Sequence, residues 1–163
     1  KAIPFGLQHV LAMFVANIAP ILIVAGVVKM PVEASAALIQ TAMIIAGLGG
    51  FLGTSLRFLT GKLCHLLVVS TFPLGTFVVN IVGSFIIGIL FGLVEKTNLI
   101  SPMMNVLLIT GFCGGFTTFS TFADDIYLLI SQKHWLTMGV YFSLSVILGV
   151  LLVMAGRMMI KSA

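Results

Sequence analysis

Charged side chains are scarce in this sequence, since Asp, Glu, Lys and Arg make up only 7% of its 163 residues. A typical soluble domain contains about a quarter charged residues. Because 60% of the residues are hydrophobic, the chain has too few polar side chains to cover its apolar surface in water. The composition therefore excludes an ordinary soluble domain and predicts an all-α membrane protein.

The sequence also lacks the usual signs of catalysis. It shows no metal-ligand spacing, no nucleophile next to a base and no phosphate-binding loop, and His9, His65 and His134 are scattered. Two cysteines, Cys64 and Cys113, form no disulfide framework. The net charge of +4 is spread over loops and forms no nucleic-acid-binding patch. We therefore expect neither an enzyme nor a nucleic-acid-binding protein.

The few charges divide the chain into uncharged stretches, each long enough to cross a bilayer. We predict five transmembrane helices from these stretches: Ala2–Val28, Ala34–Leu56, Leu63–Val94, Thr97–Ala123 and His134–Gly156. The second helix is expected to end near Arg57, with Leu63–Phe72 forming a re-entrant or interfacial piece. In the third, Ser84, Gly88 and Gly92 share one face and indicate a packing seam.

The positive charges give no preferred orientation. Five alternating helices place equal numbers on the two sides of the membrane, which is either an accident of a small protein or a sign of dual topology. In the second case the chain would insert both ways and pair as an antiparallel dimer. The two groups are Lys1, Arg57, Lys62 and Lys133 on one side, and Lys29, Lys96, Arg157 and Lys161 on the other.

The most informative segment is Gly111–Asp125, which reads GFCGGFTTFSTFADD and lies largely inside an uncharged stretch. Its glycines and hydroxyl side chains predict that the fourth helix is broken at Gly114–Thr117. Irregular backbone inside a membrane is tolerated where it lines a cavity or binds an ion. This segment therefore indicates ion handling.

A helix break exposes groups that bind either sign of ion. Carbonyls near Gly114 and Thr117 could coordinate a small cation. The hydroxyls of Thr118, Ser120 and Thr121 could donate to an anion.

Two phenylalanines, Phe119 and Phe122, lie on one face of the same segment. Their ring edges carry partial positive charge and could hold an anion weakly. Packing is the usual role of phenylalanine in a membrane helix, but the surrounding hydroxyls and glycines favour the ionic role here. Asn80, in the preceding helix, could either make an interhelical hydrogen bond or face the ion.

Three segments resemble those of the Fluc (CrcB) fluoride channels. The resemblance covers about Ala46 to Lys161, with the three motifs in the right order and spacing. They are Gly49–Phe58 (GGFLGTSLRF), Pro73–Asn80 (PLGTFVVN) and Gly111–Phe122 (GFCGGFTTFSTF).

This resemblance implies a passive fluoride channel in a bacterial inner membrane that exports fluoride and confers fluoride resistance. It also implies four helices per subunit, an antiparallel dual-topology homodimer with two pores, and a central structural sodium ion. Phe119, Phe122 and Asn80 match pore-lining residues, and the carbonyls of Gly114 and Thr117 match the sodium ligands.

Further positions match by the same resemblance. Tyr141 and Ser145 correspond to polar residues that help to line the fluoride path, whereas Gly149 falls where relatives can have a serine. Arg57 corresponds to the arginine that ends the family's first helix, and Asp125 to an acidic position near the vestibule.

The front of the chain departs from this pattern. Residues 1–47 resemble the first helices of uracil/xanthine permeases, so we predict a permease-like segment fused to a channel subunit at 48–163. The alternative function is a nonconducting chimera in which the front segment is only a membrane anchor. Nucleobase transport is a more distant possibility, because the later permease segments are absent.

Overall fold

The computed structural model describes residues 18–19, 22–23, 25–27, 29–96 and 100–162. All regular elements in these ranges are helices, which confirms the all-α prediction. Within the described residues, four spans are long and apolar enough to cross a membrane: Val32–Leu67, Leu74–Lys96, Met103–Ser131 and Trp135–Ser162. The fifth predicted helix, Ala2–Val28, lies largely outside the described residues.

Helix α2 (Val32–Leu67) is longer than the sequence predicts. It continues well beyond Arg57, so the expected end at that residue is wrong, and Leu63–Leu67 are part of the helix. Only Val68–Pro73 leave the helical path before α3 begins. The extension has a simple cause: between Arg57 and Leu67 the sequence has no proline, and a single glycine, Gly61, is tolerated inside a helix.

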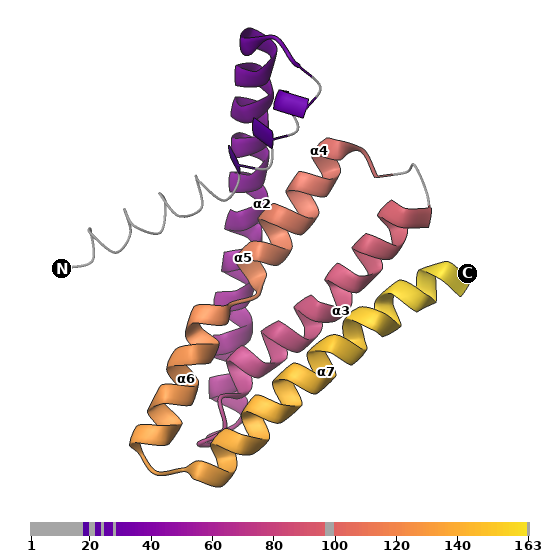
Figure 1. The fold of residues 1–163 in the computed structure, drawn as a ribbon. Coiled ribbons are helices and arrows are strands. Elements are labelled where there is room, and N and C mark those ends of the chain that lie inside the picture. The colour runs from indigo at the N-terminus through magenta and orange to yellow at the C-terminus, as the bar shows by residue number, and fades with distance from the viewer. Residues whose placement is uncertain (1–17, 20–21, 24, 28, 97–99, 163) are drawn as a thin grey trace, which may run out of the picture.

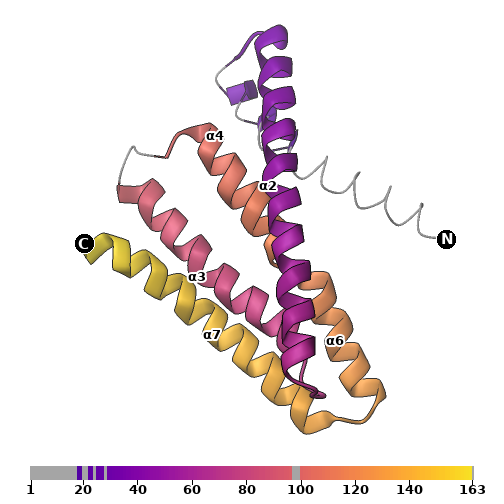
Figure 2. The same cartoon turned by 180° about the vertical axis from the view of Figure 1, so that it is seen from behind.

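Helices α3 (Leu74–Lys96) and α7 (Trp135–Ser162) lie side by side along most of their length (Figures 1 and 2). A Cβ atom on Gly88 would meet the backbone of Val153, and one on Gly92 would lie 3.2 Å from the Arg157 carbonyl oxygen. Residue numbers rise together along the contact, so the two helices are parallel. The predicted seam of small residues is confirmed at these glycines.

The third span consists of four pieces. A short helix α4 (Pro102–Asn105) leads into a π-helix η1 (Val106–Cys113), then α5 (Gly114–Phe116) and α6 (Phe119–Ser131). The predicted break is present, and the residues that leave the helix are Thr117 and Thr118. Gly114 itself keeps helical backbone angles, with φ −63° and ψ −35°.

Helix α2 crosses η1 and α5 at backbone-to-backbone distance (Figure 1). A Cβ on Gly115 would lie 2.6 Å from the Gly50 carbonyl oxygen, and Cβ atoms on Gly49 and Gly53 would meet the η1 backbone. Glycine is required on both sides of this crossing because no side chain fits there. The crossing holds the break against the polar residues of α2.

Candidate functional site

The break at Thr117 and Thr118 frees peptide groups that a continuous helix would pair. Thr117 is extended, with φ −79° and ψ 161°, and Thr118 has φ −152° and ψ 122°. Unpaired peptide groups are costly inside a membrane, so other helices must satisfy them. Partners come from both α3 and α2.

Asn80 on α3 binds both peptide groups of Thr118. Its Nδ2 donates to the Thr118 carbonyl at 3.0 Å, and its Oδ1 accepts from the Thr118 N–H at 2.8 Å. The interhelical hydrogen bond considered from the sequence is therefore present. Because the amide nitrogen carries two hydrogens, one N–H is still available for a ligand.

Helix α2 supplies two further donors to the break. The Thr54 hydroxyl donates to the Gly115 carbonyl at 3.4 Å, and Arg57 Nη1 donates to the Thr117 carbonyl at 3.3 Å. Arg57 therefore lies at the break rather than at a helix end. Thr54 was not predicted as a site residue, although it lies three positions before Arg57 on the same helix face.

The three predicted hydroxyls gather where α6 begins. Thr118 Oγ1 accepts from the Thr121 N–H at 3.2 Å and so caps the helix. The Thr118 hydroxyl also donates to that of Thr121 at 3.0 Å and lies 3.3 Å from that of Ser120. These groups form one cluster at a helix N-terminus, a position that favours negative charge.

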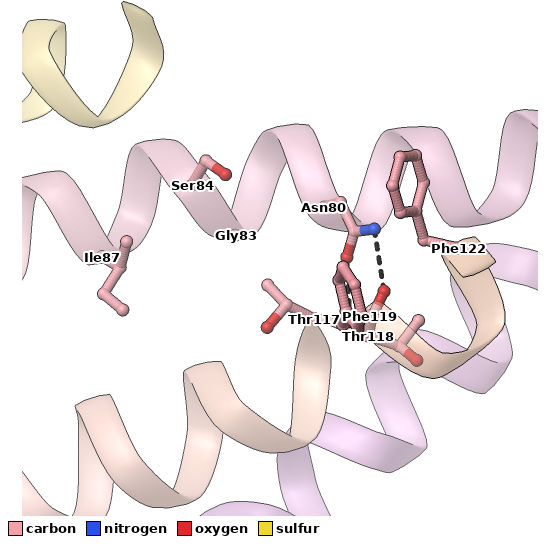
Figure 3. Close-up of a pocket in the computed structure, with 8 residues that line it drawn as sticks. All are labelled: Asn80, Gly83, Ser84, Ile87, Thr117, Thr118, Phe119 and Phe122. Atoms are coloured by element: carbon pink, nitrogen blue, oxygen red, sulfur yellow. Dashed lines mark hydrogen bonds between the residues drawn. The ribbon is translucent and has the colours of Figure 1, made fainter. Parts of the chain in front are cut away.

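Phe119 and Phe122 border a cavity of about 290 Å³ between α3 and the break (Figure 3). Their ring centroids are 6.2 Å apart, but their surroundings differ. Phe119 is 81% exposed, whereas Phe122 is 9% exposed and packs in the core. The cavity is lined by Asn80, Gly83, Ser84, Ile87, Thr117, Thr118, Phe119 and Phe122.

Tyr141 on α7 contacts Phe122, which borders the cavity. It is fully buried, and its ring centroid lies 5.2 Å from that of Phe122. Its hydroxyl donates to Asp125 Oδ2 at 3.1 Å, which ties α7 to α6. Ser145 lies one turn further along α7, and its buried hydroxyl has no hydrogen-bond partner among the described residues.

The Gly114 carbonyl is released by the same rearrangement. The Thr118 N–H, which would bond to Gly114 in a continuous helix, donates to Asn80 instead. The Thr117 carbonyl already accepts from Arg57. One chain thus offers two carbonyls at the break, which is fewer than the oxygen ligands that a hard cation takes.

Gly83 and Ser84 border the cavity but were not predicted as site residues. A Cβ on Gly83 would meet the Thr117 methyl group, so glycine is needed for the break to approach α3. Ser84 was assigned only to the packing seam. Its spacing of four residues from Asn80 is the signal that could have placed it beside the site.

The fold and the break together define a multi-pass integral membrane protein with polar backbone inside a helical bundle. The family model described as CrcB-like protein, Camphor Resistance (CrcB), matches residues 44–157. The chain belongs to this family. The match begins inside α2, which is continuous across the predicted boundary between residues 47 and 48.

Curated relatives share this region. A protein of Flavobacterium psychrophilum named fluoride-specific ion channel FluC is 45% identical over 114 residues, covering 70% of this chain and 92% of that protein. A protein of the same name from Azobacteroides pseudotrichonymphae is 40% identical over 114 residues, with 70% and 91% covered. One from Leptospira interrogans is 34% identical over 120 residues, with 74% and 94% covered.

Proposed function

We propose that this chain is the subunit of a fluoride-specific ion channel of the inner membrane. The observation that carries this proposal is its 45% identity to a protein of that name, over 92% of that protein's length. The site agrees in its chemistry, since the residues around the cavity offer an amide N–H and aromatic ring edges to an anion.

The cavity suits an anion that binds weakly and passes through better than one that binds tightly. Among the described residues, no Lys or Arg borders it. A full positive charge would hold the ion strongly, whereas one amide N–H and ring edges hold it weakly. Conduction requires binding that is strong enough for entry and weak enough for release. The protein would thus move fluoride passively and perform no covalent chemistry.

A second copy of the chain would complete the channel. A cavity of about 820 Å³ runs along α2 and the break, and Thr54, Arg57 and Ser120 border it. Phe119, which is 81% exposed, borders it too. Lipid cannot satisfy such polar groups, so we propose that a copy in the opposite orientation covers this face, giving an antiparallel homodimer with two pores.

The dimer would also bind a structural sodium ion through backbone carbonyls at the break. The Gly114 carbonyl is free of the helical ladder, and the Thr117 carbonyl keeps a second lone pair beside its bond to Arg57. Two carbonyls from each of two chains could surround a small cation. The nearby positive charge of Arg57 opposes cation binding, and because one chain offers only two carbonyls, the sodium site depends on the second copy.

Fluoride efflux from liposomes tests the proposed channel. Purified protein is reconstituted into vesicles loaded with potassium fluoride, and efflux is followed with a fluoride electrode after a potassium ionophore removes the voltage. We expect rapid release of fluoride and no release of chloride from matched vesicles. Fluoride release no faster than from protein-free vesicles, with well-folded protein, would reject the channel. In a bacterium, a passive channel of this kind would export fluoride from the cytoplasm down its gradient.

A further inference from the structure

Ser84 lies one helical turn beyond Asn80 on the same face of α3. Both residues border the cavity beside the break, with Gly83 between them and Ile87 further along (Figure 3). Four residues of α-helix correspond to about 6 Å along the axis. The two polar side chains therefore stand in succession along α3.

The Ser84 hydroxyl has no hydrogen-bond partner among the residues that the structure describes. Some helical hydroxyls in the described chain bond to the carbonyl four residues earlier, as Thr41 does at 2.8 Å and Ser162 at 3.0 Å. Ser84 forms no such bond and no other hydrogen bond within the described residues. A hydroxyl without a partner in apolar surroundings is unfavourable, so this position calls for a ligand or water.

Helix α7 leaves the hydroxyl uncovered. Gly149 faces it, and a Cβ built on Gly149 would lie 3.5 Å from Ser84 Oγ. This contact follows the parallel register of the two helices, because Gly149 follows Ser84 by the same number of positions as Val153 follows Gly88. The same register places the unpaired Ser145 level with Asn80. Unpaired polar groups thus collect along the α3–α7 seam.

We infer that the Ser84 hydroxyl contacts the permeating anion one turn beyond Asn80, at the level where α7 has only Gly149 opposite this hydroxyl. This inference rests on the proposed channel function. Asn80 commits one N–H to Thr118 and keeps one for the ion. Ser84 offers the next donor, so the ion exchanges one neutral donor for another and is never held by a full charge.

Three substitutions test this role in the liposome efflux assay. Ser84→Ala removes the donor, and we expect fluoride flux to fall by about tenfold, the effect of losing one hydrogen bond to a charged group. Ser84→Thr keeps a hydroxyl and should recover most of the flux. Ser143→Ala is the matched control, because Ser143 is an exposed serine of α7 outside the cavity, and it should conduct like the unmodified chain.

The outcomes separate the inference from the proposed function. If the unmodified chain conducts fluoride and Ser84→Ala conducts equally well, the inference is overturned while the channel function stands. If the unmodified chain does not conduct, the channel function itself fails.

A packing role for Ser84 is distinguished by thermal unfolding in detergent and by Ser84→Cys, which preserves the volume but is a weak donor. Reduced flux in Ser84→Cys at an unchanged unfolding temperature supports the contact. Full flux in that variant overturns it.

Discussion

Among single residues, Asn80 makes the interhelical hydrogen bonds considered from the sequence and also borders the cavity where its proposed contact with the ion would occur. Its side chain replaces the helical partners that Thr118 lacks, and one of its amide N–H groups is not used in those bonds. The bonds from Asn80 to Thr118 stabilise the fold whether or not an ion is present. Its removal should therefore be visible in stability as well as in transport.

Replacing Asn80 with alanine should destabilise the break. Both peptide groups of Thr118 would lose their partner, and each unpaired buried group costs about 1–3 kcal/mol. We expect the free energy of unfolding in detergent to fall by about 2–4 kcal/mol, measured by thermal or denaturant unfolding. Ser143→Ala provides the control. A variant as stable as the unmodified chain would show that the two hydrogen bonds contribute little.

The two phenylalanines should respond differently to the same substitution. Phe122→Ile removes ring contacts with Tyr141 and Phe142, so it should lower stability by about 1 kcal/mol. Phe119→Ile alters an exposed ring and should change stability by less than about 0.5 kcal/mol. Both should reduce fluoride efflux, because both rings border the cavity. Undiminished flux in both variants would exclude ring edges from the ion path.

At the level of helices, close contact at glycines determines the arrangement. The α2 crossing over η1 and α5 and the α3–α7 seam both bring backbones together where no Cβ fits. Apolar surface alone cannot drive helices together in lipid, so such packing supplies much of the association energy. The α2 crossing holds the break directly, whereas the α3–α7 seam fixes α3, which reaches the break through Asn80.

Two glycines of α7 form a matched pair for this effect. A Cβ at Gly156 would lie 2.6 Å from the Phe85 carbonyl oxygen, whereas a Cβ at Gly139 meets nothing within 4 Å. We expect Gly156→Ala to lower the free energy of unfolding by about 1–3 kcal/mol. Gly139→Ala should be neutral or stabilise by up to about 1 kcal/mol, since alanine favours helix. Equal unfolding temperatures for the two variants would contradict close packing at the seam.

For the molecule as a whole, the structure changes the count of positive charges on the two sides of the membrane. Arg57 binds the break rather than marking a membrane interface, and Lys1 lies outside the described residues. The remaining described charges are few, so orientation in the membrane should still be easy to bias.

Added charge should test the proposed antiparallel dimer. Two lysines inserted at the α6–α7 turn near Lys133, or two after Ser162, should favour opposite orientations of the chain. Each biased variant alone should show strongly reduced fluoride efflux, because a uniform orientation removes the antiparallel partner. Membranes from cells that express both variants together should recover the flux. Full flux from either variant alone would argue against dual topology.

The sequence by itself determined the membrane class, the approximate helices and the presence of a polar break, because each depends on local composition. Scarce charge leaves long apolar stretches, and the glycines and hydroxyls of Gly111–Asp125 cannot form a regular span. Only the tertiary structure decided where α2 ends, which residues leave the helix and how Asn80 and Arg57 bind them. Those features depend on contacts between distant segments: Thr118 gives up its helical partner because Asn80 offers a better-placed one, and Ser84 borders the cavity because Gly83 lets the break approach α3.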